Sequence, residues 1–140
     1  MFLERAMILL AALLLALAGV AIWRAILARR LRRLGGQTLP ETLVGLFDTA
    51  GPAFLYFTTD SCVQCRYQQR PILDQLAARL DAAVQTVDAV EHEQLARYFG
   101  IMTVPTTVLL DRGLRPVAIN HGVASLPQLE EQWRAAMNGS

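Results

Sequence analysis

A run of 18 residues without a charged side chain, from Ala6 to Trp23, constrains this chain of 140 residues more than any other feature. Leu, Ala and Ile dominate the run, and at ~1.5 Å per residue a helix of this length nearly spans a hydrocarbon core of ~30 Å. Trp23 and Arg24 stand where an interfacial aromatic side chain and an arginine reaching for the headgroups would lie, which extends the span to about Leu27. No polar stripe interrupts the run, so a buried helix of a soluble protein is disfavoured. The sequence therefore predicts one transmembrane helix.

A cleaved signal peptide is the alternative interpretation of this run. Arg5, the apolar stretch and Ala16-Leu17-Ala18 imitate the three regions of a signal sequence. Two features oppose cleavage, because apolar residues continue past Ala18 and a cluster of five Arg follows. Basic residues next to a span favour the cytoplasmic side. We therefore expect a single-pass protein of the cell membrane whose domain faces the cytoplasm, with an extracytoplasmic domain as the alternative.

Charge is unevenly distributed along the chain. Residues 1–40 carry six Arg against one Glu, a net charge of +5, whereas residues 41–140 carry seven Arg against eleven Asp and Glu, a net charge of −4. The second part has no sustained basic patch, so nucleic acid is not an expected partner. We expect an anchor with a basic flank over 1–34, a flexible linker over 35–40 and one domain over 41–140, whose length is sufficient for a single core.

The pattern of apolar residues beyond residue 40 alternates between strand and helix. Short apolar runs predict strands, and apolar residues at intervals of three and four predict helices. Asp88 and Ser125 each begin a capping-box pattern, and Asp111-Arg112-Gly113 suits a hairpin turn. We expect helices at 40–47, at 62–80, at 88–99 and after 125, and strands at 53–58, 84–87, 106–110 and 116–120. This order predicts an α/β fold with a mixed central sheet flanked by helices.

The two cysteines of the chain, Cys62 and Cys65, follow a predicted strand and open a predicted helix. A Cys at a helix N-terminus faces unpaired N–H groups and the positive end of the dipole, which stabilises the thiolate and lowers its pKa below ~8.5. Cys62 is therefore the candidate nucleophile, and Cys65 can attack a mixed disulfide on Cys62 and release the partner. A structural disulfide would be a weak staple of ~2 kcal/mol for so short a loop. A zinc site is the other alternative, but His92 and His121 do not have zinc-finger spacing.

Three segments of the domain carry a recognisable combination of motifs. These are 59–66 (TDSCVQCR), 71–76 (PILDQL) and 100–106 (GIMTVPT). Together they resemble the thioredoxin family, and the resemblance covers residues from about 41 to 137. It implies a thioredoxin fold with a redox-active cysteine pair. It further implies that Pro105 is a cis-proline facing that pair, that Val104 offers its backbone to an extended substrate, and that Gly122 lies nearby. A strand-initiating proline is the alternative for Pro105.

The chain departs from the family pattern at several positions. The family commonly has Trp before the first Cys and Gly-Pro between the pair, where this chain has Ser61 and Val63-Gln64. The buried acid that often assists the resolving Cys would fall at Tyr56, and a Tyr with a pKa of ~10 is a poor base at neutral pH. Water or another group must then take that proton. Pro71 follows the second Cys by six residues rather than the usual five, which shifts the expected helix kink.

The sequence therefore predicts a membrane-tethered thiol-disulfide oxidoreductase that exchanges dithiol for disulfide with protein partners and contributes to cell redox homeostasis. Such an enzyme would need no metal and no organic cofactor. In the cytoplasm, where thiols are kept reduced, we expect net reduction of substrates. Outside it, disulfide formation or reduction serving cytochrome maturation would be expected. A non-catalytic thioredoxin-fold binding or redox-sensing module at the membrane is the alternative function.

Overall fold

The computed structural model describes residues 1–35, 45 and 51–139. Internal contacts divide the chain into two units, Met1–Arg33 and Leu34–Ser140. The predicted linker and the helix predicted at 40–47 lie outside the described residues, apart from Gly35 and Gly45. The expected domain boundaries therefore stay a prediction.

From Phe2 onward the first unit is helical, and its helix, α1 (Phe2–Gly35), extends two residues beyond it. Its segment Phe2–Arg30 is long and apolar enough to cross a membrane, and none of its most apolar window is buried against other residues. At ~1.5 Å per residue this segment exceeds the ~30 Å of a hydrocarbon core. The predicted apolar N-terminal helix is confirmed as a candidate membrane span. By length and composition alone, a signal sequence would look the same.

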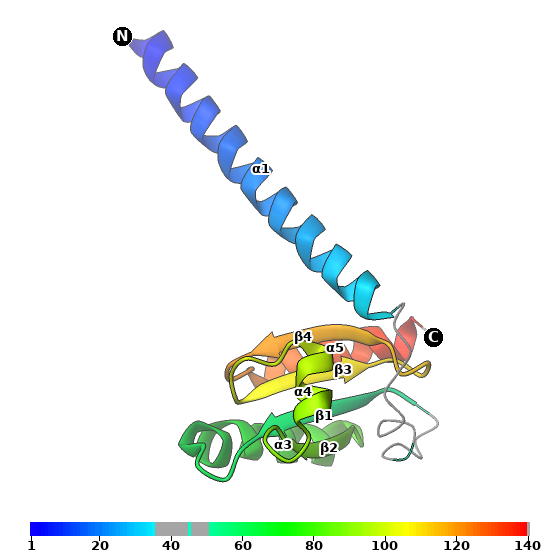
Figure 1. The fold of residues 1–140 in the computed structure, drawn as a ribbon. Coiled ribbons are helices and arrows are strands. Elements are labelled where there is room, and N and C mark those ends of the chain that lie inside the picture. Colours follow the sequence, from blue (N-terminus) through cyan, green and yellow to red (C-terminus); the bar gives the residue numbers. More distant parts are fainter. Residues whose placement is uncertain (36–44, 46–50, 140) are drawn as a thin grey trace. The chain divides into compact units, whose positions relative to one another are not determined.

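A mixed four-stranded sheet organises the second unit, and its strands lie in the order β2-β1-β3-β4 (Figure 1). The strands are β1 (Ala53–Thr58), β2 (Ala83–Asp88), β3 (Thr106–Leu110) and β4 (Pro116–His121). Strand β1 pairs in parallel with β2 and antiparallel with β3, and β3 pairs antiparallel with β4. All four strands agree with the predicted ranges to within one residue at each end. The predicted α/β fold with a mixed central sheet is confirmed.

Within residues 51–139, three α-helices flank this sheet: α3 (Arg70–Leu80), α4 (Glu93–Phe99) and α5 (Leu126–Asn138). Helix α4 begins later than predicted. The carboxylate of Asp88 accepts hydrogen bonds from two backbone N–H groups, at 2.8 and 3.0 Å, but it caps an intervening turn rather than the helix. Ser125 caps α5 by accepting from the N–H of Gln128, whereas the Gln128 side chain bonds to Asn120. Only half of the expected capping box therefore forms there.

Strand β1 packs on both of its faces, because alternate residues of a strand point in opposite directions. On one face Phe54 stacks on Trp133 of α5, with ring centroids 5.9 Å apart, in a cluster that also includes residues of α3. On the other face Phe57 meets Phe99 of α4 edge to face, at 6.0 Å. Figure 1 shows α4 on the side of the sheet opposite α5. The result is a three-layer domain with an apolar core on each side of the sheet.

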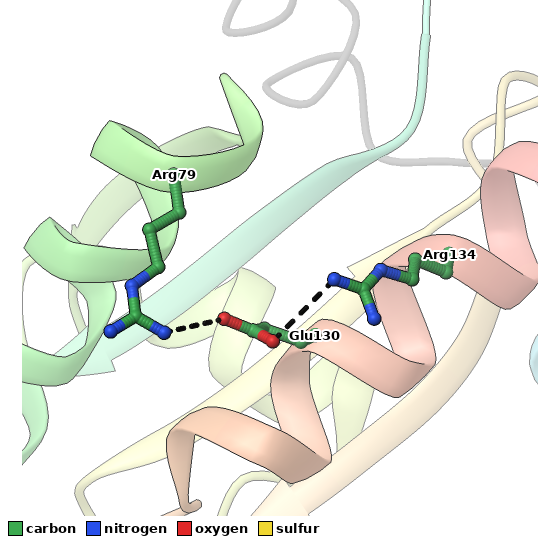
Figure 2. Close-up of polar contacts among 3 residues, drawn as sticks. All are labelled: Arg79, Glu130 and Arg134. Atoms are coloured by element: carbon green, nitrogen blue, oxygen red, sulfur yellow. Dashed lines mark hydrogen bonds and ion pairs between the residues drawn. The ribbon is translucent and has the colours of Figure 1, made fainter.

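A small cluster of charges joins α3 to α5 (Figure 2). The Nη1 atom of Arg79 lies 3.3 Å from Oε1 of Glu130, and Nη2 of Arg134 lies 3.7 Å from Oε2 of the same carboxylate. Both Arg side chains are largely exposed, at 61% and 64%, whereas Glu130 is 17% exposed. Solvent weakens such pairs to ~1 kcal/mol or less. The cluster is therefore a minor addition to the apolar packing between these helices.

We predict that Glu130→Gln lowers the free energy of unfolding by up to ~1 kcal/mol, because it removes the charge shared by both ion pairs. Urea unfolding at low salt measures this loss, which should shrink at high salt. Glu131→Gln, at an exposed neighbouring position, is the matched control. Equal losses in the two variants would contradict a contribution from the ion pairs.

Candidate active site

Cys62 and Cys65 lie where strand β1 ends and the next helix begins. The N–H of Cys62 donates to the carbonyl of Thr59, at 3.1 Å, which closes the turn after the strand. The two sulfur atoms form a disulfide, and the two Cα atoms are 5.3 Å apart. The Sγ atom of Cys62 also accepts a hydrogen bond from the N–H of Cys65, at 3.1 Å. This sulfur thus meets a backbone donor of the first helical turn, the environment that stabilises a thiolate.

The two cysteines differ in exposure. Cys65 is 2% exposed and belongs to the apolar cluster on the α3 and α5 side of the sheet, whereas Cys62 is half-buried at its edge. A disulfide in another protein can therefore reach Cys62 more readily than Cys65. This difference is consistent with the predicted roles of nucleophile and resolving thiol, which stay predictions.

The helix after the cysteine pair contains one π-helical turn, η1 (Cys65–Gln69). The N–H of Arg70 donates to the carbonyl of Cys65, five residues earlier. Pro71 then stands in the first turn of α3, directly after this π turn. A π turn holds more residues than an α turn. The additional residue before Pro71 is thus absorbed within the helix, where the sequence predicted a displaced kink.

Tyr56, at the position where the family often has a buried acid, is 2% exposed. Its hydroxyl donates to the carbonyl of Cys65, at 2.9 Å. Burial raises the pKa of Tyr56 above its ordinary value of 10.0, while Thr58 and Arg70 act in the opposite direction. The side chain is therefore neutral at physiological pH, so it acts as a hydrogen-bond donor to the cysteine turn and not as a base.

We predict that stability falls as pH rises above 10.0, and that Tyr56→Phe reduces this fall. The unfolded chain releases the Tyr56 proton near 10.0, whereas burial holds the pKa of the folded state higher. The contribution of Tyr56 to the free energy of unfolding is not affected by pH below the pKa of the unfolded chain. As pH rises from there through the pKa of the folded chain, stability is lost by up to ~1.4 kcal/mol per pH unit. Denaturant unfolding at a series of alkaline pH values measures the slope.

Tyr98 provides the comparison for this experiment, because burial raises its pKa as well. Tyr98→Phe should also reduce the alkaline loss of stability, and the variant that lacks both tyrosines should lose the contributions of both. The same alkaline slope in the wild-type chain and in Tyr56→Phe would contradict the prediction.

The Val104–Pro105 peptide bond is cis, as the family resemblance implied. Gly122 donates from its N–H to the carbonyl of Pro105, at 2.9 Å, and has a φ of 83° that favours glycine. Val104 and Cys62 both pack against the apolar cluster on the α3 and α5 side. The structure therefore brings all four predicted site residues, Cys62, Cys65, Val104 and Pro105, to the same end of the sheet. The substrate-binding role of the proline loop, residues 103–105, stays a prediction.

Gln69 is a residue of this region that sequence reasoning missed. It is fully buried at the end of η1, and its side chain bonds to both backbone groups of Ala124, at 2.7 and 3.3 Å. A Gln in a helix is most often exposed. No local pattern in the sequence indicates that this Gln is buried.

A polar cavity of about 330 Å³ adjoins Cys62 and Tyr56. Arg66 and Arg70 line it together with several carboxylates, and Nη2 of Arg66 donates to the carbonyl of Asp60, at 3.2 Å. A cavity of this polarity is large enough for several water molecules. Water at this place can accept a proton from the site, which Tyr56 cannot do at neutral pH.

The two histidines do not add a metal site to the cysteine pair. His121 is exposed, and Nδ1 of His92 lies 3.3 Å from the carbonyl of Asp88. Within residues 1–35 and 51–139, no three His, Cys, Asp or Glu side chains gather in an arrangement that could hold a metal ion. Among the described residues, the reactive groups at this end of the domain are therefore its two cysteines.

Comparison with known proteins agrees with this geometry. A family model described as "TraF: F plasmid transfer operon protein" matches residues 49–133, more than half of the chain. Comparison with curated proteins finds no match.

Among solved structures, a single-site mutant of thioredoxin from Halobacterium salinarum NRC-1 is similar, with a TM-score of 0.62 and 26% identity, over 71% of this chain and 86% of that chain. Reduced Schistosoma mansoni thioredoxin pre-protein has a TM-score of 0.57 and 24% identity, over 67% of this chain and 86% of that chain. At that identity the second likeness shows the fold alone. With its thioredoxin fold and its disulfide-forming cysteine pair, the chain belongs to the thioredoxin-like TraF family and has the features of thiol-disulfide redox chemistry.

Proposed function

We propose that this protein is a membrane-tethered thiol-disulfide oxidoreductase that acts on protein partners through Cys62 and Cys65. The observation that carries the proposal is the asymmetry of the pair, a half-buried Cys62 at a helix N-terminus joined to a buried Cys65. A purely structural disulfide has no need of an accessible sulfur facing backbone donors. In such a protein, residues 1–34 are the anchor, residues 35–40 are the linker and residues 41–140 are the catalytic domain.

The reaction is a pair of exchanges in which two electrons pass between the cysteine pair and a substrate. In the reducing direction the Cys62 thiolate attacks a substrate disulfide, forms a mixed disulfide and releases one substrate thiolate, which takes up a proton. Cys65 then loses its proton and attacks Sγ of Cys62. The second substrate thiol leaves, and the Cys62–Cys65 disulfide is the oxidised product. The reverse sequence oxidises a substrate dithiol.

Exposed apolar side chains near the cysteines support proteins as partners. Val63 and Tyr67 follow Cys62 on the helix and are 69% and 70% exposed, and Met102 before the proline loop is 87% exposed. Apolar side chains grouped on a surface are typical of sites that bind other proteins. A substrate segment bound to the backbone of Val104 could cover these side chains.

The direction of the reaction depends on the compartment. The five Arg after the apolar run favour a cytoplasmic domain under the positive-inside rule, and in the cytoplasm reduction of partners is the expected direction. On the other side of the membrane the same pair would form disulfides or reduce partners for cytochrome maturation.

We predict that Cys65→Ser accumulates mixed disulfides between Cys62 and partner proteins in native membranes. Without the resolving thiol, the first exchange has no rapid second step. Non-reducing gels followed by mass spectrometry identify the trapped partners, and reducing agent should release them.

The double variant Cys62→Ser with Cys65→Ser is the control and should trap nothing. If the single variant traps no partner and the wild-type chain does not reduce a model protein disulfide, the proposal is wrong. A non-catalytic binding or redox-sensing module would then be the better assignment.

We predict that a phosphatase reporter fused after residue 140 is inactive and that a fluorescent protein at the same place is bright, because the proposed orientation keeps the C-terminus in the cytoplasm. Replacing the Arg residues at 29–33 by Gln should weaken this orientation and raise phosphatase activity. As a control, the same reporters at the N-terminus should give the opposite result, an active phosphatase and a dim fluorescent protein. An active phosphatase at the C-terminus of the unaltered chain would place the domain outside.

A further inference from the structure

The side chain of Gln69 joins two segments that are distant in the sequence. Its Oε1 atom accepts from the N–H of Ala124 at 2.7 Å, and its Nε2 atom donates to the carbonyl of Ala124 at 3.3 Å. The residue is 0% exposed, and 55 positions separate it from Ala124. A buried amide with both ends paired is a directional contact that apolar neighbours cannot replace. We name this pair of hydrogen bonds the Gln69 clasp.

Each end of the Gln69 clasp leads to one part of the candidate site. Gln69 ends the π turn that begins at Cys65, one half of the disulfide. Ala124 lies two residues after Gly122, whose N–H donates to the carbonyl of Pro105 at 2.9 Å. A continuous path of backbone and hydrogen bonds therefore runs from the cysteine pair to the proline loop.

Exchange with a protein substrate requires that the cysteine helix and the proline loop be held in a fixed relative position. Attack on a disulfide needs the attacking and leaving sulfur atoms in line. A substrate held by the backbone of Val104 has its disulfide positioned from the proline loop, whereas the attacking sulfur is positioned from the cysteine helix. An error of ~1 Å between reacting groups can cost ~100-fold in rate.

We propose that Gln69 is a positioning residue for thiol-disulfide exchange with protein substrates. Through its clasp it fixes the proline loop against the cysteine helix, so that a substrate bound at Val104 presents its disulfide to Cys62. The inference rests on the function proposed above. Gln69 itself contacts neither reacting sulfur through a side-chain hydrogen bond, and a small disulfide that does not use the proline loop has no need of the clasp.

The test compares Gln69→Leu with Gln68→Leu in the full-length chain, in detergent. Gln68 is exposed on the same π turn, so it receives the same change without a clasp to lose. For reduction of insulin, Gln69→Leu should lower kcat/KM about tenfold or more, and Gln68→Leu should change it less than about twofold. With a small aromatic disulfide reagent, both variants should stay within about twofold of the wild-type chain. Circular dichroism verifies that each variant is folded.

A second variant keeps the inference testable if Gln69→Leu does not fold. In Gln69→Glu the ionised carboxylate still accepts from the N–H of Ala124 but cannot donate to its carbonyl, whereas the protonated form can do both. The loss of insulin reduction relative to the wild-type chain at the same pH should therefore shrink as pH is lowered. A role in stability alone would not produce this dependence in a folded variant.

The outcomes separate the two proposals. Equal losses with insulin and with the small disulfide, or no loss with either, overturn the role of Gln69 and leave the proposed function in place. A Gln69→Glu deficit that does not change with pH also overturns it. A wild-type chain that neither reduces protein disulfides nor oxidises protein dithiols overturns the proposed function and the inference with it.

Discussion

Burial of strand β1 on both faces is the interaction on which the rest of the domain depends. Five consecutive residues, 53–57, are 2% exposed or less, and four of them point alternately into the two apolar clusters. Neighbouring strands also fix β1 at both edges, where Tyr56 pairs with Thr86 of β2 and with Thr107 of β3. A shift of one residue would exchange the two cores. The end of β1 is therefore a fixed point, and the cysteine pair begins there.

The carbonyl of Cys65 connects this strand to the helix that follows. It accepts one hydrogen bond from the N–H of Arg70, which closes the π turn, and another from the hydroxyl of Tyr56. Tyr56 belongs to the strand, so the resolving cysteine is attached through its backbone to the core of the sheet. Where the family resemblance implied a proton acceptor, this chain therefore has a hydrogen-bond donor, Tyr56. The neighbouring polar cavity, which Cys62 and Tyr56 line, is large enough for water that could accept a proton.

The sequence predicted what local patterns determine. Strands such as β1 and β3 follow from short apolar runs between turn residues, and the cysteine pair and Pro105 follow from their spacing within the family pattern. The start of α4 was predicted wrongly, because Asp88 accepts the same two backbone hydrogen bonds whether a turn or a helix follows. The burial of Gln69 could not be predicted, since its partner is 55 residues away and no local pattern indicates it. The π turn was not predicted either. It takes up the one additional residue between Cys65 and Pro71, for which the sequence predicted a displaced kink.

The unequal burial of the two sulfur atoms also bears on damage by peroxides. An oxidant arriving from solvent meets Cys62 before Cys65, which is 2% exposed, and converts the Cys62 thiolate to a sulfenic acid. The Cys65 thiol lies within bonding distance, as their disulfide demonstrates, and it condenses with the sulfenic acid to give the disulfide and water. In the reduced pair this condensation would end the oxidation at a stage that another thiol can reverse, before the irreversible sulfinic and sulfonic acids form. An accessible sulfur with a buried thiol beside it is an arrangement that favours the disulfide over further oxidation.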